Sequence, residues 1–386
     1  MLTIYDLVDS KAIGAYVEEI YSNQIPDLGE TLFPRRKKLG LDLKWIKGYN
    51  QVPVSLMPSA FDAKPTLRDR IGLTEVQTEM PFFREAMRFG EKDRQELLRI
   101  QDSSNMQYLR AELDKIFDDR AHLVAGADVV PERMRMSLLV DGKIDIVAPD
   151  DKGVFVQYMY DYDKSGAWKT SNFINLTQGE GNVPWSDTKN SNPVVDLLNI
   201  KRRAAASQGT ILKRGIMTTA TWALLLQNEK IKLDMNVQNG QNIILTDKRL
   251  RQYLIDMVDI DFTIYDKIYK DADLTDHQFY PNGFVALLPV GGLGNTWYGT
   301  TPEEADLMAG NKDADVTIVR TGVAILTKKE SLPVNIITSV SEIVLPSFER
   351  MNETFSLKVA DIKDDPSFML PDGDGYDYFN GSGKKI

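Results

Sequence analysis

The feature that most constrains this chain is a long stretch without a helix breaker, because neither glycine nor proline occurs between Gly90 and Gly126. Apolar residues within it keep helical spacing, and charged residues occupy the other faces. We predict one helix over residues 91–123, which at 1.5 Å per residue is roughly 50 Å long. A helix about three times the usual length serves as a scaffold on which other elements pack. Its apolar stripe consists of Met106, Leu109, Leu113, Ile116 and Phe117.

A second constraint is an extended arm that precedes this helix. Apolar and polar residues alternate from Leu41 to Trp45 and again from Thr74 to Met80, which predicts the two strands of a hairpin over 39–82. Prolines between these strands exclude a helix or a central strand there. The hairpin extends at most ~70 Å, whereas a compact globule of this length has a radius of gyration of ~21 Å. Since a lone hairpin is marginal in water, we expect the arm to lie on a neighbouring molecule.

The remaining pattern mixes helices and strands, which predicts an α+β fold. Ser10 begins a short helix, and Asp141-Gly142 is the turn of a predicted hairpin joining strands 136–140 and 144–147. Asn192-Pro193 opens a further helix that ends at Gly209. The tail from Asp361 is rich in Asp, Gly and Pro, as in a peripheral arm. The other predicted elements are helices 222–226 and 248–258 and strands 154–160, 262–265, 284–290, 316–326, 334–344 and 355–359.

The composition offers little for catalysis. The chain has no cysteine and two histidines, His122 and His277, so a thiolate nucleophile, a Ser-His-Asp triad and a multi-histidine metal site lack their residues. Its net charge is −10, which repels nucleic acid on average. No apolar run approaches the ~18 residues that span a bilayer. We expect a protein that is not an enzyme, with no catalytic residue, cofactor or metal.

Two short motifs, one glycine-rich and one basic, have simpler explanations than a binding site. The glycine-rich run 291–294 lacks the Lys-Ser/Thr of a phosphate loop, which favours a flexible surface loop. The basic run from Arg35 to Lys38 fits DNA or the acidic groups of a neighbouring subunit, but we expect a solvated loop there.

The order and spacing of several segments resemble the lambda-type major capsid protein E family, which has the Hong Kong 97-like fold. Leu32-Phe33-Pro34 before the strand at 41–48 resembles the family's N-arm leading into its E-loop. Residues 80–85 resemble the approach to the spine helix. The closest local similarity is Trp185-Ser186-Asp187 followed by 192–197, Gly209 and Trp222, and Leu345-Pro346-Ser347-Phe348 fits the return to the P-domain. Residues 52–65 and the tail have no counterpart in this comparison.

The resemblance implies a division of the chain into arms and domains. The P-domain is discontinuous, contains the spine helix at about 91–123, and carries the A-domain as an insert. The expected ranges are N-arm 1–38, E-loop 39–82, P-domain 83–207 and 333–360, A-domain 208–332, and a C-terminal arm or tail 361–386.

The resemblance also implies a structural function. The protein is expected to assemble into the hexamers and pentamers of an icosahedral phage head that encloses double-stranded DNA without sequence-specific contacts, with the A-domains around the symmetry axes. Expected partners are further copies of the chain, a separate scaffolding protein and the portal, with a decoration protein as a further candidate and no membrane. We expect the protein in the virion after assembly in the host cytoplasm. Because nothing before Ser10 is long enough to be a scaffolding domain, we also expect no long N-terminal segment to be cleaved.

Aromatic and basic residues of the two arms are the candidate contacts between subunits: Phe33, Arg35, Arg36, Trp45, Tyr49, Phe61, Arg68 and Arg70.

Three alternatives stay open at this point. An encapsulin-like nanocompartment shares the fold and holds protein cargo. A carboxylate-based, carbohydrate-acting enzyme would use Trp185, Trp222 and Trp297 as stacking platforms. A phage tail tube or sheath protein would form helical rather than closed assemblies.

Overall fold

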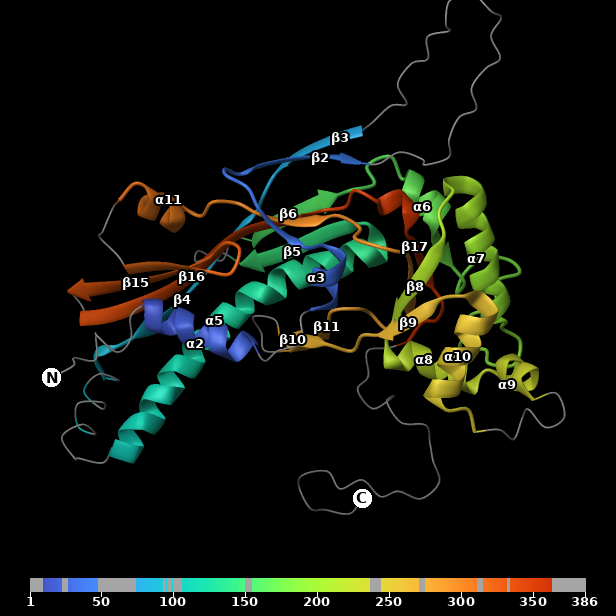
Figure 1. Ribbon diagram of the computed structural model, residues 1–386, viewed down its shortest axis with the longest axis horizontal. Helices are drawn as coiled ribbons and strands as arrows, with labels where there is room; N and C mark the ends of the chain where they lie inside the picture. Colours follow the sequence, from blue (N-terminus) through green and yellow to red (C-terminus); the bar gives the residue numbers. More distant parts are fainter. Residues whose placement is uncertain are drawn as a thin grey trace, which may run out of the picture.

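The computed structural model describes residues 10–22, 27–47, 74–92, 95, 99, 106–149, 155–236, 244–270, 275–310, 315–331 and 334–362. Two sheets lie towards opposite ends of the molecule, and the long helix α5 runs beneath one of them towards the other (Figure 1). This mixture confirms the predicted α+β class.

The predicted long helix exists, and it continues beyond its predicted end. Helix α5 spans Met106–Asp141, which includes residues 106–123 of the prediction and continues through Gly126 and Pro131. Residues 136–140, predicted as a strand, form its last turns, and Met136 and Leu138 are fully buried there. A short apolar run fits a buried helix as well as a strand. The burial of these side chains offsets the backbone hydrogen bond that Pro131 removes.

The first sheet has six strands and supports α5. The long strand β16 pairs with β4, β15 and β13, and α5 packs across its face. Helix α2 (Ser10–Ser22) confirms the helix predicted at Ser10, and it packs on β14. Helix α11 (Pro302–Met308) lies against β14 and β15. The strands, in order across the sheet, are β1 (Arg35–Lys37), β13 (Asn295–Tyr298), β16 (Val334–Ser347), β15 (Val323–Ser331) and β14 (Asp315–Val319), with β4 (Phe82–Phe89) beside β16.

One predicted strand of this sheet is two strands. Residues 316–326 form the hairpin of β14 and β15, because Arg320 and Gly322 adopt positive φ angles of 51° and 140° that reverse the chain.

The second sheet has five strands and separates two cores. Along β12, Val285 and Leu287 lie in the core that the sheet forms with four helices on its outer face. Ala286 and Leu288 lie in the core that includes α5. Burial on both faces explains the continuous apolar sequence of β12. The strand order is β7 (Phe173–Asn175), β17 (Phe355–Lys358), β12 (Phe284–Pro289), β8 (Leu212–Met217) and β9 (Asp261–Ile264), and the helices are α7 (Pro193–Gln208), α8 (Thr219–Gln227), α9 (Glu229–Met235) and α10 (Asp247–Val258).

Helix α7 confirms the capping prediction. The side chain of Asn192 accepts a hydrogen bond from the Val195 N–H at 3.3 Å, and Pro193 occupies the first turn. Gly209 ends the helix with φ 65°, a conformation that glycine adopts without steric cost.

Three antiparallel strand pairs complete the described body. The arm prediction is confirmed where it is described, because β2 (Asp42–Lys47) pairs antiparallel with β3 (Thr74–Glu79). The hairpin predicted with Asp141-Gly142 as its turn does not form, because Asp141 is the last residue of α5. The strand that follows, β5 (Lys143–Pro149), pairs instead with β6 (Phe155–Asp161). The shorter elements are α3 (Leu28–Leu32), α6 (Ala167–Asn172), β10 (Ile268–Lys270), β11 (Asp276–Gln278) and the 3-10 turn η2 (Met351–Glu353).

The expected ranges of the arms and domains stay predictions, and the packing shows which elements share a core or a sheet. Helix α7, expected in the P-domain, packs in the core of the second sheet, as does β17. Residues 295–331, expected in the A-domain, supply three strands of the first sheet. The tail from 363 lies outside the described residues.

Candidate subunit-contact surfaces

A buried charged network on α5 holds the N-terminal segment onto the body. Glu132 and Arg135 are both fully buried, with Arg135 Nη1 3.1 Å from Glu132 Oε2. Arg135 Nε also donates to the Thr296 hydroxyl at 2.9 Å, and that hydroxyl donates to the Phe33 carbonyl at 2.8 Å. Helix α5 is therefore tied to β13 and to the chain just before β1.

The other oxygen of Glu132 extends this network. It accepts hydrogen bonds from the Gly29 N–H at 2.9 Å and from the Tyr265 hydroxyl at 2.7 Å. Burial raises the pKa of Tyr265 well above its ordinary value, and the nearby charge of Glu132 raises it further. Tyr265 thus stays protonated and remains a donor, so one carboxylate joins α3, α5 and the end of β9.

Arg35, a predicted contact between subunits, is engaged within its own chain. Its guanidinium lies 3.1 Å from Glu30 and 3.0 Å from Asp128, and 5.6 Å from the Tyr298 ring. Burial lowers the pKa of Arg35, but Tyr298, Asp128 and Glu30 outweigh it and raise the pKa above its ordinary value. Because β1 pairs with β13, the expectation of a solvated loop at 35–38 was wrong.

The other predicted contacts fall into three groups. Phe33 is fully buried against Phe348, with ring centroids 5.4 Å apart, and Trp45 is buried against Tyr162. These two side chains already pack within one chain, as Arg35 does. Arg36 is exposed and stays a predicted contact. Tyr49, Phe61, Arg68 and Arg70 lie outside the described residues.

Of the three tryptophans considered as stacking platforms, two are buried and the third is half-buried. Trp185 and Trp222 are buried, and their indole N–H groups donate to Asp196 and Asp247. Trp297 donates to the Ser347 hydroxyl. Among the described residues, no cluster of His, Cys, Asp or Glu is placed to hold a metal ion. No described helix has the length and apolar character to cross a membrane.

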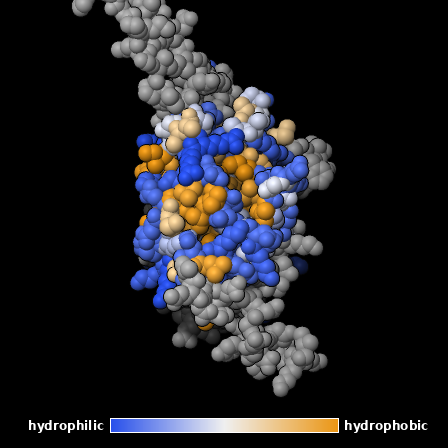
Figure 2. Space-filling model, turned by 90° about the vertical axis from the view of Figure 1, so that its right-hand side faces the viewer, coloured by the Kyte–Doolittle hydropathy of each residue, from blue (hydrophilic) through white to orange (hydrophobic). Residues whose placement is uncertain are grey.

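Apolar side chains are exposed on the end formed by α7 to α10. Figure 2 views this end directly and shows apolar side chains gathered among polar ones. Exposed apolar patches on a folded surface mark interaction sites. The large exposed apolar residues on these helices are Val195, Leu233, Ile255 and Met257.

The free edge of β4 is a second surface with contact potential. Strand β4 pairs with β16 alone within the described part of the chain, and residues 84–88 are exposed. An open edge of this length presents unpaired N–H and C=O groups that suit a segment of another molecule.

The model of the phage major capsid protein E family matches residues 9–359. The chain belongs to this family. It is a phage major capsid protein, and the resemblance found in the sequence is confirmed. This match leaves the encapsulin alternative with less support. A search of curated proteins found no match.

Two solved structures show the same fold as this capsid protein. One, assigned as the capsid protein of an Escherichia coli CFT073 prophage, has a TM-score of 0.54 at 15% identity, covering 92% of this chain and 99% of that chain. The other, a phage-related protein from Bordetella bronchiseptica RB50, has a TM-score of 0.51 at 10% identity, covering 92% and 98%. The predicted Hong Kong 97-like fold is therefore confirmed.

Sequence reasoning missed the buried charges of α5. Charged residues on a helix are usually solvated, and no spacing distinguishes Glu132 and Arg135 from the exposed charges around them. Only the positions of Gly29, Tyr265 and Thr296 identify their role.

Proposed function

We propose that this capsid protein is the shell subunit of a tailed double-stranded DNA phage head, built as hexamers and pentamers. The observation that carries the proposal is the family match over residues 9–359, on a body with the corresponding fold. The subunit acts by assembling with copies of itself and without catalysis.

The end formed by α7 to α10 faces the symmetry axes in this proposal. Fully burying one large apolar side chain contributes about 1.5–3 kcal/mol, and Val195, Leu233, Ile255 and Met257 are only partly exposed. Association costs at least about 4 kcal/mol in lost freedom of motion. A single contact of this kind is therefore weak. In a ring of five or six subunits each subunit contacts two neighbours, and the two contacts together hold it in the ring.

The edge of β4 and the arms connect subunits within and between these rings. A segment of a neighbour laid along residues 84–88 would pair main-chain groups on the side of β4 that no described strand occupies. Arg36 is exposed on β1, a strand of the same sheet as β4, and is a further contact in this proposal.

The interior of the shell holds the genome without reading its sequence. The net charge of −10 disfavours tight binding to phosphates, so packaged DNA remains mobile. The proposed partners are a separate scaffolding protein and the portal, with a decoration protein on the outside, and assembly takes place in the host cytoplasm.

Electron microscopy of the purified protein, alone and with its scaffolding protein, tests the proposal. We expect closed shells and rings of five and six subunits. Helical tubes would favour a tail protein, and a subunit that stays monomeric under all assembly conditions would contradict a shell function.

A further inference from the structure

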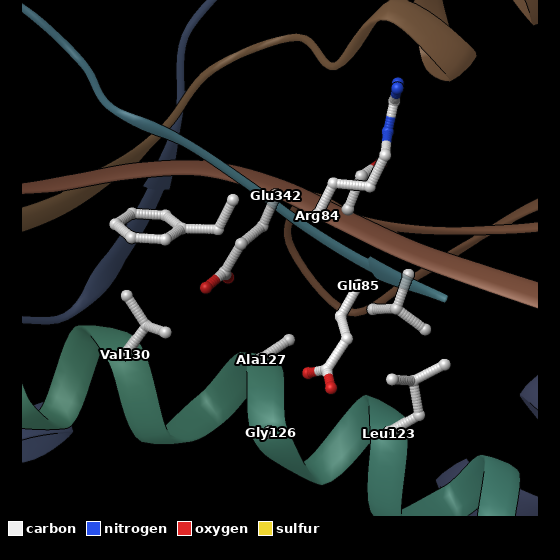
Figure 3. Close-up of a pocket in the computed structure, with 10 residues that line it drawn as sticks. Arg84, Glu85, Leu123, Gly126, Ala127, Val130 and Glu342 are labelled. Atoms are coloured by element: carbon white, nitrogen blue, oxygen red, sulfur yellow. The ribbon is translucent and has the colours of Figure 1, made fainter. Parts of the chain in front are cut away.

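A cavity of about 160 Å³ lies between α5 and the strands β4 and β16 (Figure 3). Helix α5 lines it with Leu123, Ala127 and Val130, and the strands add Phe83 and Val340. Its volume equals that of about five water molecules. Its lining is mostly apolar, and it lies beside the exposed residues of β4.

The side chain of Glu342 is directed from β16 into this cavity, towards α5 (Figure 3). Only 1% of Glu342 is exposed, and neither carboxyl oxygen has a hydrogen-bond partner within the part of the chain that the structure describes. Burial raises the pKa of Glu342 well above its ordinary value. The charge of Asp128 raises this pKa further, and Arg35 and Arg135 only partly oppose the shift. Burial and the lack of a hydrogen-bond partner among the described residues both favour the neutral form of this carboxyl in the isolated subunit.

A second carboxylate lies on the same side of the sheet. Glu85 points from β4 towards Leu123 and Gly126, whereas its neighbour Arg84 points to the opposite side and pairs with Glu303 (Figure 3). Register explains the arrangement, because Phe83 is opposite Glu342 and strand residues two apart share a face.

Among the described residues, the cations that act on Glu342 are each paired with another carboxylate. Arg35 pairs with Glu30 and Asp128, and Arg135 pairs with Glu132. The titratable and charged groups that act on Glu342 or line the cavity with it are Asp128, Arg35, Arg135, Tyr298, Arg84 and Glu85.

We propose that this cavity is a socket for a lysine or arginine side chain of a neighbouring copy of the chain. The aliphatic stem of that side chain packs against Phe83, Leu123 and Val130, and its cation lies between Glu342 and Glu85. Basic side chains bury their methylene stems on apolar surfaces while the charged end seeks a carboxylate. The occupant is a second copy because a shell crowds each subunit with copies of itself, so this inference rests on the proposed function.

Filling the socket changes the protonation state of Glu342. The neutral carboxyl loses its proton to solvent, and the resulting carboxylate pairs with the incoming cation. Each occupied socket therefore releases up to one proton, and by linkage assembly becomes more favourable as pH rises.

Glu342→Gln tests the inference, with the exposed Glu180→Gln as the matched control. Glutamine is neutral and close to the same shape, so we expect circular dichroism and the urea midpoint to show a folded subunit. We expect the concentration needed for assembly to rise about tenfold. The heat of assembly, measured in two buffers of different protonation enthalpy, gives the number of protons released. Glu342→Gln should release up to one proton fewer per subunit than the wild type. Glu180→Gln should match the wild type in both readouts.

Two results would overturn the inference. One is a Glu342→Gln protein that assembles at the wild-type concentration and releases as many protons. The other is a wild-type shell whose cryo-EM map shows no basic side chain of a neighbour in the cavity. If the wild type forms no shell at all, the proposed function fails rather than the socket.

Discussion

Replacing Arg135 by methionine should destabilise the subunit strongly. The change removes the partner of Glu132 and a donor to Thr296, while Gly29 and Tyr265 keep Glu132 in place. A buried charge left without its partner costs about 3–5 kcal/mol. With an unfolding entropy of about 2.1 cal/mol/K per residue over 386 residues, the melting temperature should fall by about 4–6 °C.

Equilibrium urea unfolding of the unassembled subunit, followed by tryptophan fluorescence, measures this cost. The exposed Arg202→Met on α7 is the matched control and should stay within about 0.5 kcal/mol of the wild type. The double variant Glu132→Gln/Arg135→Met should recover about half of the loss. It removes the unpaired charge, and the glutamine oxygen still accepts from Gly29 and Tyr265. An Arg135→Met protein within about 1 kcal/mol of the wild type, or a double variant less stable than the single one, would refute this account.

Four further changes have defined outcomes. Gly294→Ala should cost about 1–3 kcal/mol in thermal unfolding, because a Cβ there would collide with the Ser347 carbonyl. Asn192→Ala should cost about 1 kcal/mol in urea unfolding, since it removes the cap of α7. Folding raises the pKa of Glu342, so the wild type should lose stability relative to Glu342→Gln as pH rises above about 4.5, and parallel curves would contradict this. Deleting residues 47–73 should leave a folded body by circular dichroism that assembles poorly by sedimentation, and loss of folding would count against the arm.

Local signals predicted several elements correctly. The alternation at 41–45 and 74–80 identified β2 and β3, and Asn192-Pro193 with Gly209 identified both ends of α7. In each case the deciding interactions lie within a few residues of the chain or follow its side-chain period. The order of such segments was also sufficient for the family resemblance.

Other features depend on contacts between distant residues. Helix α5 continues through Pro131 because its far half is buried against the strands and loops of two sheets. Residues 35–37 form a strand only because residues 295–298 lie beside them. Phe33 and Trp45 were predicted as contacts between subunits, and the structure buries both in the core of their own chain. Nothing in the neighbouring sequence signals that the Glu342 carboxyl is buried with no hydrogen-bond partner among the described residues.

A cryo-EM reconstruction of assembled particles tests the central claim most directly. The account predicts closed icosahedral shells whose five- and six-subunit rings bring the α7–α10 ends together at the symmetry axes, with the exposed apolar residues Val195 and Met257 buried there. Helical tubes, or closed shells in which this end stands away from every neighbouring subunit, would contradict it.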